Sequence, residues 1–278
     1  RASDNLFSTP NLVQYFKPRN LKNQTWNVLW PCFQPIIHGW TPAINHKNTR
    51  TFPVRFGEPM NTPCFSDIRG LHSTVDEFVD AVARRDRILL IEGGRGSVML
   101  AQRTNGLLPK PTEAEQSSID ATRQKMRMPT TPGRSFRAPH HTTSWAGIFG
   151  SADGRRVGEM GLAQHGTLCL FDAPEFPRRI VEGIGLAMQK SLHNMMLIAT
   201  AKPCPCGMFM SHNKPCTCTP QQLERWGIRL DALCKTLAIN KTITVPWVST
   251  EETLASPLCP TTAELKSKNK RAVAGSSC

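Results

Sequence analysis

The stretch IEGGRGSVMLAQR, residues 91–103, follows a short apolar run and contains three glycines. The run RILLI, residues 87–91, predicts a buried strand, and residues 98–104 predict a helix after the glycines. A strand, a glycine-rich turn and a helix in this order are the parts of a phosphate-binding loop. A working loop reads GxxxxGK[ST], in which the lysine neutralises phosphate and the hydroxyl group holds magnesium. The stretch therefore predicts an α/β fold and raises the question of whether its loop still binds a nucleotide.

Further periodic segments extend this pattern along the chain. Apolar runs predict more buried strands, and helical spacing predicts more helices. Short buried strands that alternate with helices predict a parallel sheet covered on both faces, which is a three-layer αβα arrangement. The additional strands are expected at residues 167–171, 195–200 and 242–245, and the additional helices at residues 75–85 and 180–190.

The composition points to a polyanionic partner. The 278 residues carry a net charge of +13 and are 39% hydrophobic, which suffices for one core. A surplus of this size is typical of proteins that bind nucleic acid, although a basic protein without such a partner would look the same. No apolar run has the length of a membrane span, so we expect no membrane association.

Residues 1–64 differ from the rest and are expected to form a basic extension. No acidic residue occurs between Asn5 and Gly57, while prolines and tryptophans recur. Such a composition suits an extended arm on a larger partner, with the charges neutralising phosphates, but it also suits a small irregular subdomain packed on the protein's own core. The candidate RNA contacts of this arm are Lys17, Arg19, Lys22, Lys47, Arg50 and Arg55.

The other end of the chain is polar as well. Residues 249–278 consist mainly of small and polar residues and include the basic run KSKNKR at 266–271. We interpret this segment as a solvated or partner-bound tail. Its candidate RNA contacts are Lys266, Lys268, Lys270 and Arg271.

Four of the ten cysteines are spaced as CxC–x9–CxC, and they are Cys204, Cys206, Cys216 and Cys218. Four thiolates in two close pairs can form a tetrahedral zinc site, which would fix a loop too small to have its own core. The alternative is four free thiols without a metal. The remaining cysteines do not resemble a secreted disulfide framework, so a reducing compartment is expected.

Three motifs that follow the glycine-rich loop carry a family resemblance. They are RSFRAPHHT at 134–142, CPCG at 204–207 and CTCTPQ at 216–221. With these motifs, residues 65–246 resemble the magnesium-chelatase-like AAA+ ATPases of the ComM/YifB type. The resemblance implies a P-loop AAA+ core. It also implies that the family's lid, its N-terminal domain and a hairpin before the strand at 195–200 are missing here.

The same resemblance implies a degenerate nucleotide site. Gly93, Gly94 and Gly96 remain in the loop, but Ser97 replaces its lysine and Val98 its hydroxyl residue. The family's second nucleotide-binding motif ends a buried strand with an aspartate and a glutamate. In this sequence Phe171 stands at the position of the metal-binding aspartate, and Asp172 stands at the position of the glutamate that activates water. Shifting the alignment by one residue makes Asp172 the metal-binding residue and leaves Ala173 at the catalytic position, so that one acid is missing either way.

Two further parts of the catalytic apparatus differ from the family pattern. Lys202 stands where the family has a polar sensor asparagine. The segment LCKTLAI, residues 233–239, contains no arginine where the family has one for the phosphoryl-transfer transition state. We therefore expect no ATP hydrolysis, no catalytic residues and no bound ATP.

Together these features predict a structural protein of an RNA–protein assembly. A mitochondrial ribosome or its assembly intermediate is expected, with ribosomal RNA and ribosomal or assembly-factor proteins as partners and no small-molecule substrate. The compartment would then be the mitochondrial matrix, and removal of a presequence would account for a chain that starts at Arg1. The alternatives are a non-hydrolysing regulatory subunit of a ComM-like motor that acts on DNA, and a divergent active motor or chelatase subunit.

Overall fold

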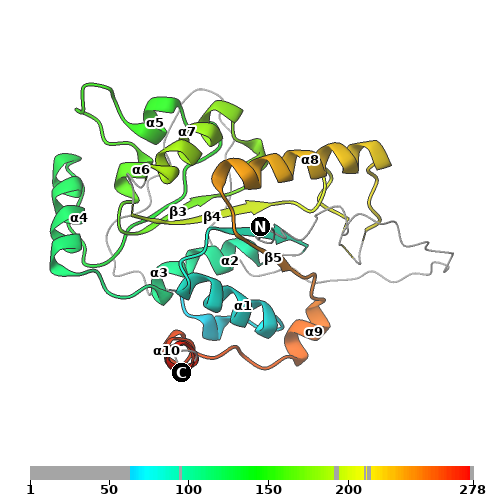
Figure 1. Ribbon diagram of the computed structural model, residues 1–278. Coiled ribbons are helices and arrows are strands. Elements are labelled where there is room, and N and C mark those ends of the chain that lie inside the picture. Colours follow the sequence, from blue (N-terminus) through cyan, green and yellow to red (C-terminus); the bar gives the residue numbers. More distant parts are fainter. Residues whose placement is uncertain (1–62, 94–95, 191–193, 210, 212–213, 276–278) are drawn as a thin grey trace, which may run out of the picture. The chain divides into compact units, whose positions relative to one another are not determined.

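The computed structural model describes residues 63–275 except 94–95, 191–193, 210 and 212–213, and for residues 269–275 it describes only the backbone. The chain divides into two units, Arg1–Met60 and Asn61–Cys278, and the second unit contains all elements described below (Figure 1). The basic arm and its six candidate RNA contacts therefore lie outside the described residues.

A five-stranded sheet, parallel throughout, forms the centre of the second unit, with strand order β2-β3-β4-β1-β5. In β1, Leu89 lies opposite Ala199 of β4 on one side and Thr242 of β5 on the other. This sheet confirms the predicted α/β class. The strands are β1 (Ile88–Glu92), β2 (Phe136–Arg137), β3 (Thr167–Leu170), β4 (Met196–Ala201) and β5 (Lys241–Val245).

The three central strands are buried because their side chains are apolar on both faces. Every residue of β3 and β4 is buried, and in β1 only the last residue, Glu92, is partly exposed. A parallel strand covered on both sides requires such continuous apolar runs rather than an alternating pattern. β2 was not predicted, since two half-buried residues leave no periodic signal.

Helices cover both faces of the sheet (Figure 1). α7 and α8 lie on one face, and α1, α2, α3 and α10 lie on the other. α7 and α8 approach closely, because a Cβ atom on Gly185 would lie 2.2 Å from the carbonyl oxygen of Thr236. The helices before β3 are α1 (His72–Ala83), α2 (Ser97–Gln102), α3 (Thr104–Leu107), α4 (Glu113–Lys125), α5 (Trp145–Phe149) and α6 (Glu159–Leu162). Those after β3 are α7 (Arg178–Gln189), α8 (Pro220–Leu237), α9 (Thr250–Ala255) and α10 (Thr262–Gly275).

Element boundaries differ from the predicted ones by a few residues for local reasons. The helix expected at 75–85 begins at His72 and ends at Ala83, because Arg85 has a positive φ of 60° and cannot continue it. Only six residues, 190–195, separate α7 from β4, so the chain has no room there for the hairpin of the family pattern.

The interpretation of residues 249–278 as a solvated tail is wrong for the part whose side chains are described. α9 and α10 form there, and Leu265 and Cys259 are only 1% and 3% exposed. The backbone N–H of Cys259 donates to the carbonyl oxygen of Ile68 at 2.9 Å. Both buried side chains belong to the same core cluster as Phe65 and Phe78, so this segment is part of the fold.

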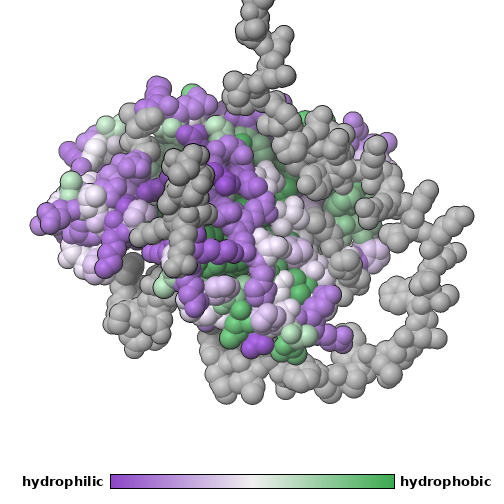
Figure 2. Space-filling model, turned by 60° about the horizontal axis from the view of Figure 1, so that its bottom comes forward, coloured by the Kyte–Doolittle hydropathy of each residue, from purple (hydrophilic) through white to green (hydrophobic). Residues whose placement is uncertain are grey.

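The surface of the described residues is mainly hydrophilic on the side of α1 and α10. Figure 2 shows hydrophobic side chains there only in small groups. None of the helices in the described part of the chain is long and apolar enough to cross a membrane.

Candidate functional site

The residues of the predicted nucleotide site gather at one edge of the sheet. β1, β3 and β4 run parallel, so their carboxyl ends share this edge, and Glu92, Asp172 and Lys202 follow from those ends. Ligands of open α/β sheets bind at such an edge, which makes it the place to examine for nucleotide chemistry. Gly94 lies outside the described residues, and the other predicted members are Gly93, Gly96, Ser97, Val98, Phe171, Asp172 and Lys202.

Ser97 occupies the lysine position of the loop and is turned inward. Its side chain is fully buried, and its hydroxyl group donates to Oε2 of Glu92 at 2.8 Å. Val98, at the position of the magnesium-holding hydroxyl, is 40% exposed and has no polar group. The described part of the loop thus presents a carboxylate and no side-chain cation. Sequence reasoning missed Glu92, because it stands at a variable position of the motif.

The two described glycines of the loop, Gly93 and Gly96, pack against the protein itself. The N–H of Gly93 donates to the carbonyl oxygen of Val245 at 2.9 Å. A Cβ atom on Gly96 would lie 2.9 Å from Cγ1 of Val245 and 3.0 Å from Cδ1 of Leu71. Gly96 has an extended φ of −171°, so close packing rather than a special backbone conformation accounts for a glycine here.

Asp172 and Lys202, which were predicted as separate site residues, lie next to each other. Nζ of Lys202 is 4.0 Å from Oδ1 of Asp172, and both side chains are about half exposed. The N–H of Asp172 donates to Oγ1 of Thr200 at 3.0 Å, which fixes the turn after β3. A lysine of the chain therefore stands beside the first carboxylate that follows β3, while Phe171 packs against the core.

The segment 233–239, where the family pattern has an arginine, forms the end of α8 and the turn after it. Ala238 there has a positive φ of 50° and closes the helix. Arg229, one turn earlier than this segment, lies with its guanidinium carbon 5.8 Å from the ring centre of Trp226 and donates to the carbonyl oxygen of Pro174. That arginine holds α8 against the turn after β3.

The cysteine cluster lies just beyond the same edge of the sheet. The Sγ atom of Cys204 is 3.4 Å from that of Cys206 and 3.8 Å from that of Cys216, and the Sγ atoms of Cys206 and Cys216 are 3.6 Å apart. With Cys218, all four sulfur atoms lie within 4.8 Å of one another. A disulfide would require about 2.05 Å, so these are four separate thiols.

Neighbouring groups hold this cluster in place. The N–H of Phe209 donates to Sγ of Cys204 at 3.3 Å, and Nε1 of Trp226 donates to the carbonyl oxygen of Lys202 at 3.1 Å. Cys218 is followed by Thr219, whose side chain caps α8 in a capping box. The strand β4 and the helix α8 thus fix the two ends of the cysteine loop.

The thiols differ in acidity. Burial raises the pKa of Cys204 to about 12, and the thiol of Cys206 adds to the increase. Burial acts in the same direction on Cys206, but hydrogen bonds from the backbone of Met208 and Thr217 outweigh it and lower the pKa of Cys206 to about 6.

The geometry of the cluster fits a tetrahedral metal ion. Zinc binds thiolate at about 2.3 Å, which places the sulfur atoms of a tetrahedron about 3.8 Å apart. The three measured distances, 3.4 to 3.8 Å, lie close to that value. The donor set therefore suits Zn²⁺, and the four cysteines of the spacing CxC–x9–CxC are brought together as predicted.

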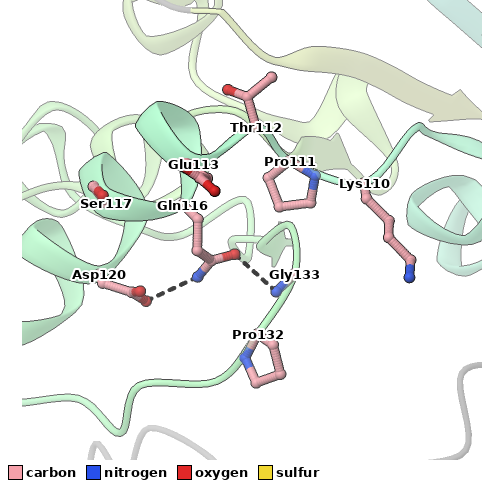
Figure 3. A pocket seen from close by; sticks show the side chains of 9 residues that line it. All are labelled: Lys110, Pro111, Thr112, Glu113, Gln116, Ser117, Asp120, Pro132 and Gly133. Atoms are coloured by element: carbon pink, nitrogen blue, oxygen red, sulfur yellow. Dashed lines mark hydrogen bonds between the residues drawn. The ribbon is translucent and has the colours of Figure 1, made fainter.

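A shallow pocket elsewhere on the described surface is unrelated to either site. It lies at the start of α4 (Figure 3), and Gln116 in it accepts from the N–H of Gly133 at 3.1 Å and donates to Asp120 at 3.0 Å. Its lining contains none of the predicted site residues. The lining residues are Lys110, Pro111, Thr112, Glu113, Gln116, Ser117, Asp120, Pro132 and Gly133.

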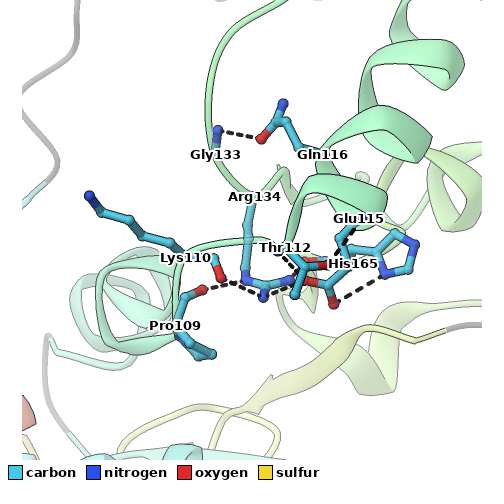
Figure 4. A network of polar contacts seen from close by, with 8 residues as sticks. All are labelled: Pro109, Lys110, Thr112, Glu115, Gln116, Gly133, Arg134 and His165. Atoms are coloured by element: carbon cyan, nitrogen blue, oxygen red, sulfur yellow. Dashed lines mark hydrogen bonds and ion pairs between the residues drawn. The ribbon is translucent and has the colours of Figure 1, made fainter.

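Beside this pocket a buried ionic network holds α4 on the core (Figure 4). Arg134 is 4% exposed in its side chain and pairs with Glu115 at 2.9 Å, while its other nitrogen atoms donate to the carbonyl oxygens of Pro109 and His165. The backbone N–H of Thr112 and then Arg134 lower the pKa of Glu115. All donors and acceptors named belong to the chain, so we assign the network to folding.

The candidate RNA contacts at the C-terminus have partners within the chain where they are described. Nζ of Lys266 donates to the carbonyl oxygen of Leu108 at 3.3 Å, and Nζ of Lys268 pairs with Asp76 at 2.9 Å. The side chains of Lys270 and Arg271 lie outside the described residues.

Comparison with known proteins identifies the family of the chain. A sequence profile described as "magnesium chelatase, subunit ChlI" matches residues 64–252. The chain belongs to this family. Among its relatives are the competence protein ComM of Haemophilus influenzae, 30% identical over 61% of this chain and 36% of that protein, and the protein YifB of Escherichia coli, 29% identical over 55% and 33%.

This member of the family is of the magnesium-chelatase-like ComM/YifB type, as predicted. It spans about a third of the length of the curated relatives that it matches. Among the solved structures that the chain matches is NtrX from Brucella abortus in complex with ATP. The TM-score is 0.40 at 13% sequence identity, over 63% of this chain and 36% of that one.

Proposed function

We propose that the chain is a non-catalytic, AAA+-derived structural protein of an RNA–protein assembly, with a mitochondrial ribosome or its assembly intermediate as the best candidate. The observation that carries the proposal is the buried hydrogen bond between Ser97 and Glu92. It places a carboxylate where a working loop directs a lysine at the phosphates of ATP.

The electrostatics of this edge disfavour ATP. A carboxylate near the phosphate position repels an anionic ligand, and serine cannot supply the charge that stabilises phosphoryl transfer. Lys202 is paired with Asp172, the first acid after β3. Among the described residues of this edge, Ser97 and Lys202 thus each have an acidic partner within the chain, and we infer that neither nucleotide binding nor hydrolysis is retained.

The charge of the chain supports an RNA-containing partner. The net charge of +13 and the arm without acidic residues between Asn5 and Gly57 suit a long polyanion. Ribosomal RNA with ribosomal or assembly-factor proteins is the partner set we propose, and the mitochondrial matrix is the proposed compartment.

We also propose that the four cysteines bind one structural Zn²⁺. Cys204, Cys206, Cys216 and Cys218 would be its ligands, and the metal would cross-link the loop between β4 and α8. Such a site supplies folding free energy rather than chemistry on a substrate, which agrees with a structural protein.

The deciding experiment is affinity purification from the native source at moderate salt, with the bound RNA sequenced and the bound proteins identified. Stoichiometric ribosomal RNA and ribosomal proteins are expected. A nucleic-acid-free complex with an intact AAA+ protein would overturn the proposal and make the chain a regulatory subunit of a ComM-like motor.

A second experiment tests the inactive site directly. Calorimetric titration of the purified chain with ATP and Mg²⁺ is expected to give no binding, with the Haemophilus influenzae relative ComM measured alongside for comparison. Saturable ATP binding, or hydrolysis above a protein-free blank, would contradict the proposed loss of chemistry.

A further inference from the structure

A tightly built loop, residues 150–158, projects beside the end of α4 (Figure 1). Its base is closed by backbone contact, because a Cβ atom on Gly158 would lie 2.3 Å from the nitrogen atom of Gly150. Ser151 donates its N–H to the carbonyl oxygen of Arg156 at 3.0 Å and accepts the N–H of Arg156 on Oγ at 2.9 Å. These contacts fix the loop in one conformation and leave its tip in solvent.

Two arginines stand at this tip. The side chain of Arg155 is 87% exposed, and Arg156 is exposed as well. Asp153 is the acid of the loop. Its carboxylate accepts hydrogen bonds from the N–H of Arg155 at 3.1 Å and from the hydroxyl group of Ser151 at 2.5 Å, and it forms an ion pair with the side chain of Arg155 at 3.3 Å. Its carboxylate is therefore used to shape the turn, and the tip keeps a surplus of positive charge.

The end of α4 and the turn that follows it add two more cations next to the loop. The two segments touch, because the N–H of Val157 lies 3.5 Å from Sδ of Met126. Lys125 and Arg127, on either side of Met126, are exposed, and Arg127 has a positive φ of 53° that turns the chain away from the helix. Among the described residues, Lys125, Arg127 and Arg156 have no ion-pair partner.

Other acids of this region are already paired with different arginines. Asp120 lies 3.9 Å from Arg123, and Glu159 forms two hydrogen bonds to Arg137 at 2.6 and 2.7 Å. They are not available to neutralise the exposed cations. We call Lys125, Arg127, Arg155 and Arg156 the basic patch.

We propose that the basic patch binds the sugar–phosphate backbone of RNA. This inference rests on the proposed function and adds to it a contact surface in the folded core, separate from the N-terminal arm and from the C-terminal lysines. Three of its four members are arginines, whose planar guanidinium groups form paired hydrogen bonds with phosphate. A rigid loop loses little conformational entropy on binding, which favours it as a contact surface.

RNA is the occupant that the charge pattern favours. The basic patch consists of four cations, and the acid beside it, Asp153, shapes the turn. Among the exposed residues of 124–127 and 152–156, none has an aromatic or large aliphatic side chain that could anchor a protein partner. Binding of an RNA phosphate backbone requires closely spaced positive charges and no apolar anchor.

The test uses two variants of the full chain that each remove four positive charges. The patch variant is K125Q/R127Q/R155Q/R156Q. The control changes four exposed cations of α7 and α8 and is R179Q/K190Q/R225Q/K235Q. Circular dichroism and thermal unfolding verify that both fold. The affinity for a fluorescently labelled poly(U) RNA is then measured at several salt concentrations.

The patch variant is expected to bind RNA at least about tenfold more weakly at low salt, and the slope of log K against log salt should become less steep by about 2–3, because each phosphate contact contributes about 0.7. The control should lose much less. Equal losses of RNA affinity in both variants, or wild-type affinity in the patch variant, would overturn the proposal that the basic patch binds RNA. If the patch variant kept wild-type RNA affinity but no longer co-purified with the proteins of the assembly, the basic patch would be a protein contact instead. If the unmodified chain binds neither poly(U) nor ribosomal RNA, the proposed function fails as well.

Discussion

Two neighbouring regions at the same edge of the sheet have opposite characters. In the phosphate loop, a serine and a glutamate are hydrogen-bonded to each other, and glycine packs against aliphatic side chains. Only two residues after Lys202, the cysteine cluster begins, with its sulfur atoms at distances that suit a metal ion. One region has turned its polar groups inward, and the other keeps four donors directed at a common centre.

The difference follows from what each site needs. Phosphoryl transfer requires a cation, a metal-binding acid, a water-activating acid and an arginine at the same time, so under the proposed function the groups that remain serve only the fold. A structural metal contributes to the free energy of folding in every molecule, whether or not a reaction takes place. We therefore expect changes in the cysteine cluster to matter far more than changes at the phosphate loop.

The largest effect is expected for Cys204→Ser. Cys204 is fully buried, and its loss should release the metal and lower the free energy of unfolding by on the order of 4 kcal/mol. Zinc is measured by mass spectrometry of the purified protein, and the midpoint of thermal unfolding should fall by about 10 °C. Cys234→Ser, in α8 outside the cluster, is the control and should keep one zinc per chain. Equal metal content in wild type and Cys204→Ser would contradict the zinc assignment.

A smaller effect is expected for Ser97→Ala. Glu92 loses a hydrogen-bond donor in a partly buried position, so the free energy of unfolding should fall by about 1–2 kcal/mol. Urea unfolding followed by tryptophan fluorescence measures it. Val98→Ala, at the neighbouring exposed position, should change stability by less than about 0.5 kcal/mol. If the two variants were equally stable, the inward-turned hydrogen bond would be unimportant.

Gly96→Ala distinguishes a packing glycine from a phosphate-binding one. The added methyl group meets Val245 and Leu71 and should cost about 1 kcal/mol, because those side chains must shift. The measurement is again urea unfolding, combined with ATP titration of both proteins. If the wild type bound ATP, and Gly96→Ala lost this affinity without losing stability, the loop would still be a nucleotide-binding loop.

The smallest effect is expected for Lys202→Met. The ion pair between Lys202 and Asp172 is half exposed and 4.0 Å long. Removing this ion pair should therefore change the free energy of unfolding by less than about 1 kcal/mol. Magnesium titration of this variant should still show no binding. Magnesium binding that appears only in Lys202→Met would show that the lysine replaces a metal ion at Asp172.

Much of the fold follows from the apolar runs. The strands at 88–92, 167–170 and 196–201 are continuous and buried, and runs of that kind are visible in a single sequence. The cysteine cluster was predicted as well, because ligand spacing along the chain limits where a metal can bind. The glycine-rich loop was related to a nucleotide site by a family resemblance, which the composition alone would not have provided, and its loss of chemistry stays a prediction.

The features that were missed depend on contacts between distant positions. In the C-terminal segment, the described side chains that are buried are Cys259, between the two helices, and Leu265 of α10, and the polar composition of the segment outweighs that signal. Glu92 and Ser97 pair only because the loop folds back, and Met126 and Val157 meet although 31 positions separate them. Spacing patterns within one segment do not contain such information.

The position of α10 has a consequence for the lifetime of the protein. Its first residue, Thr262, lies 3.5 Å from Sγ of Cys64, and an antiparallel bridge joins Leu258 to Arg69, so the last helix closes over the first turn of the fold. A protease that attacks from the C-terminal side of α10 must detach this helix before it reaches a strand. Detaching it uncovers Phe65 and α1 at once, so the two ends of the folded unit should be degraded together rather than one after the other.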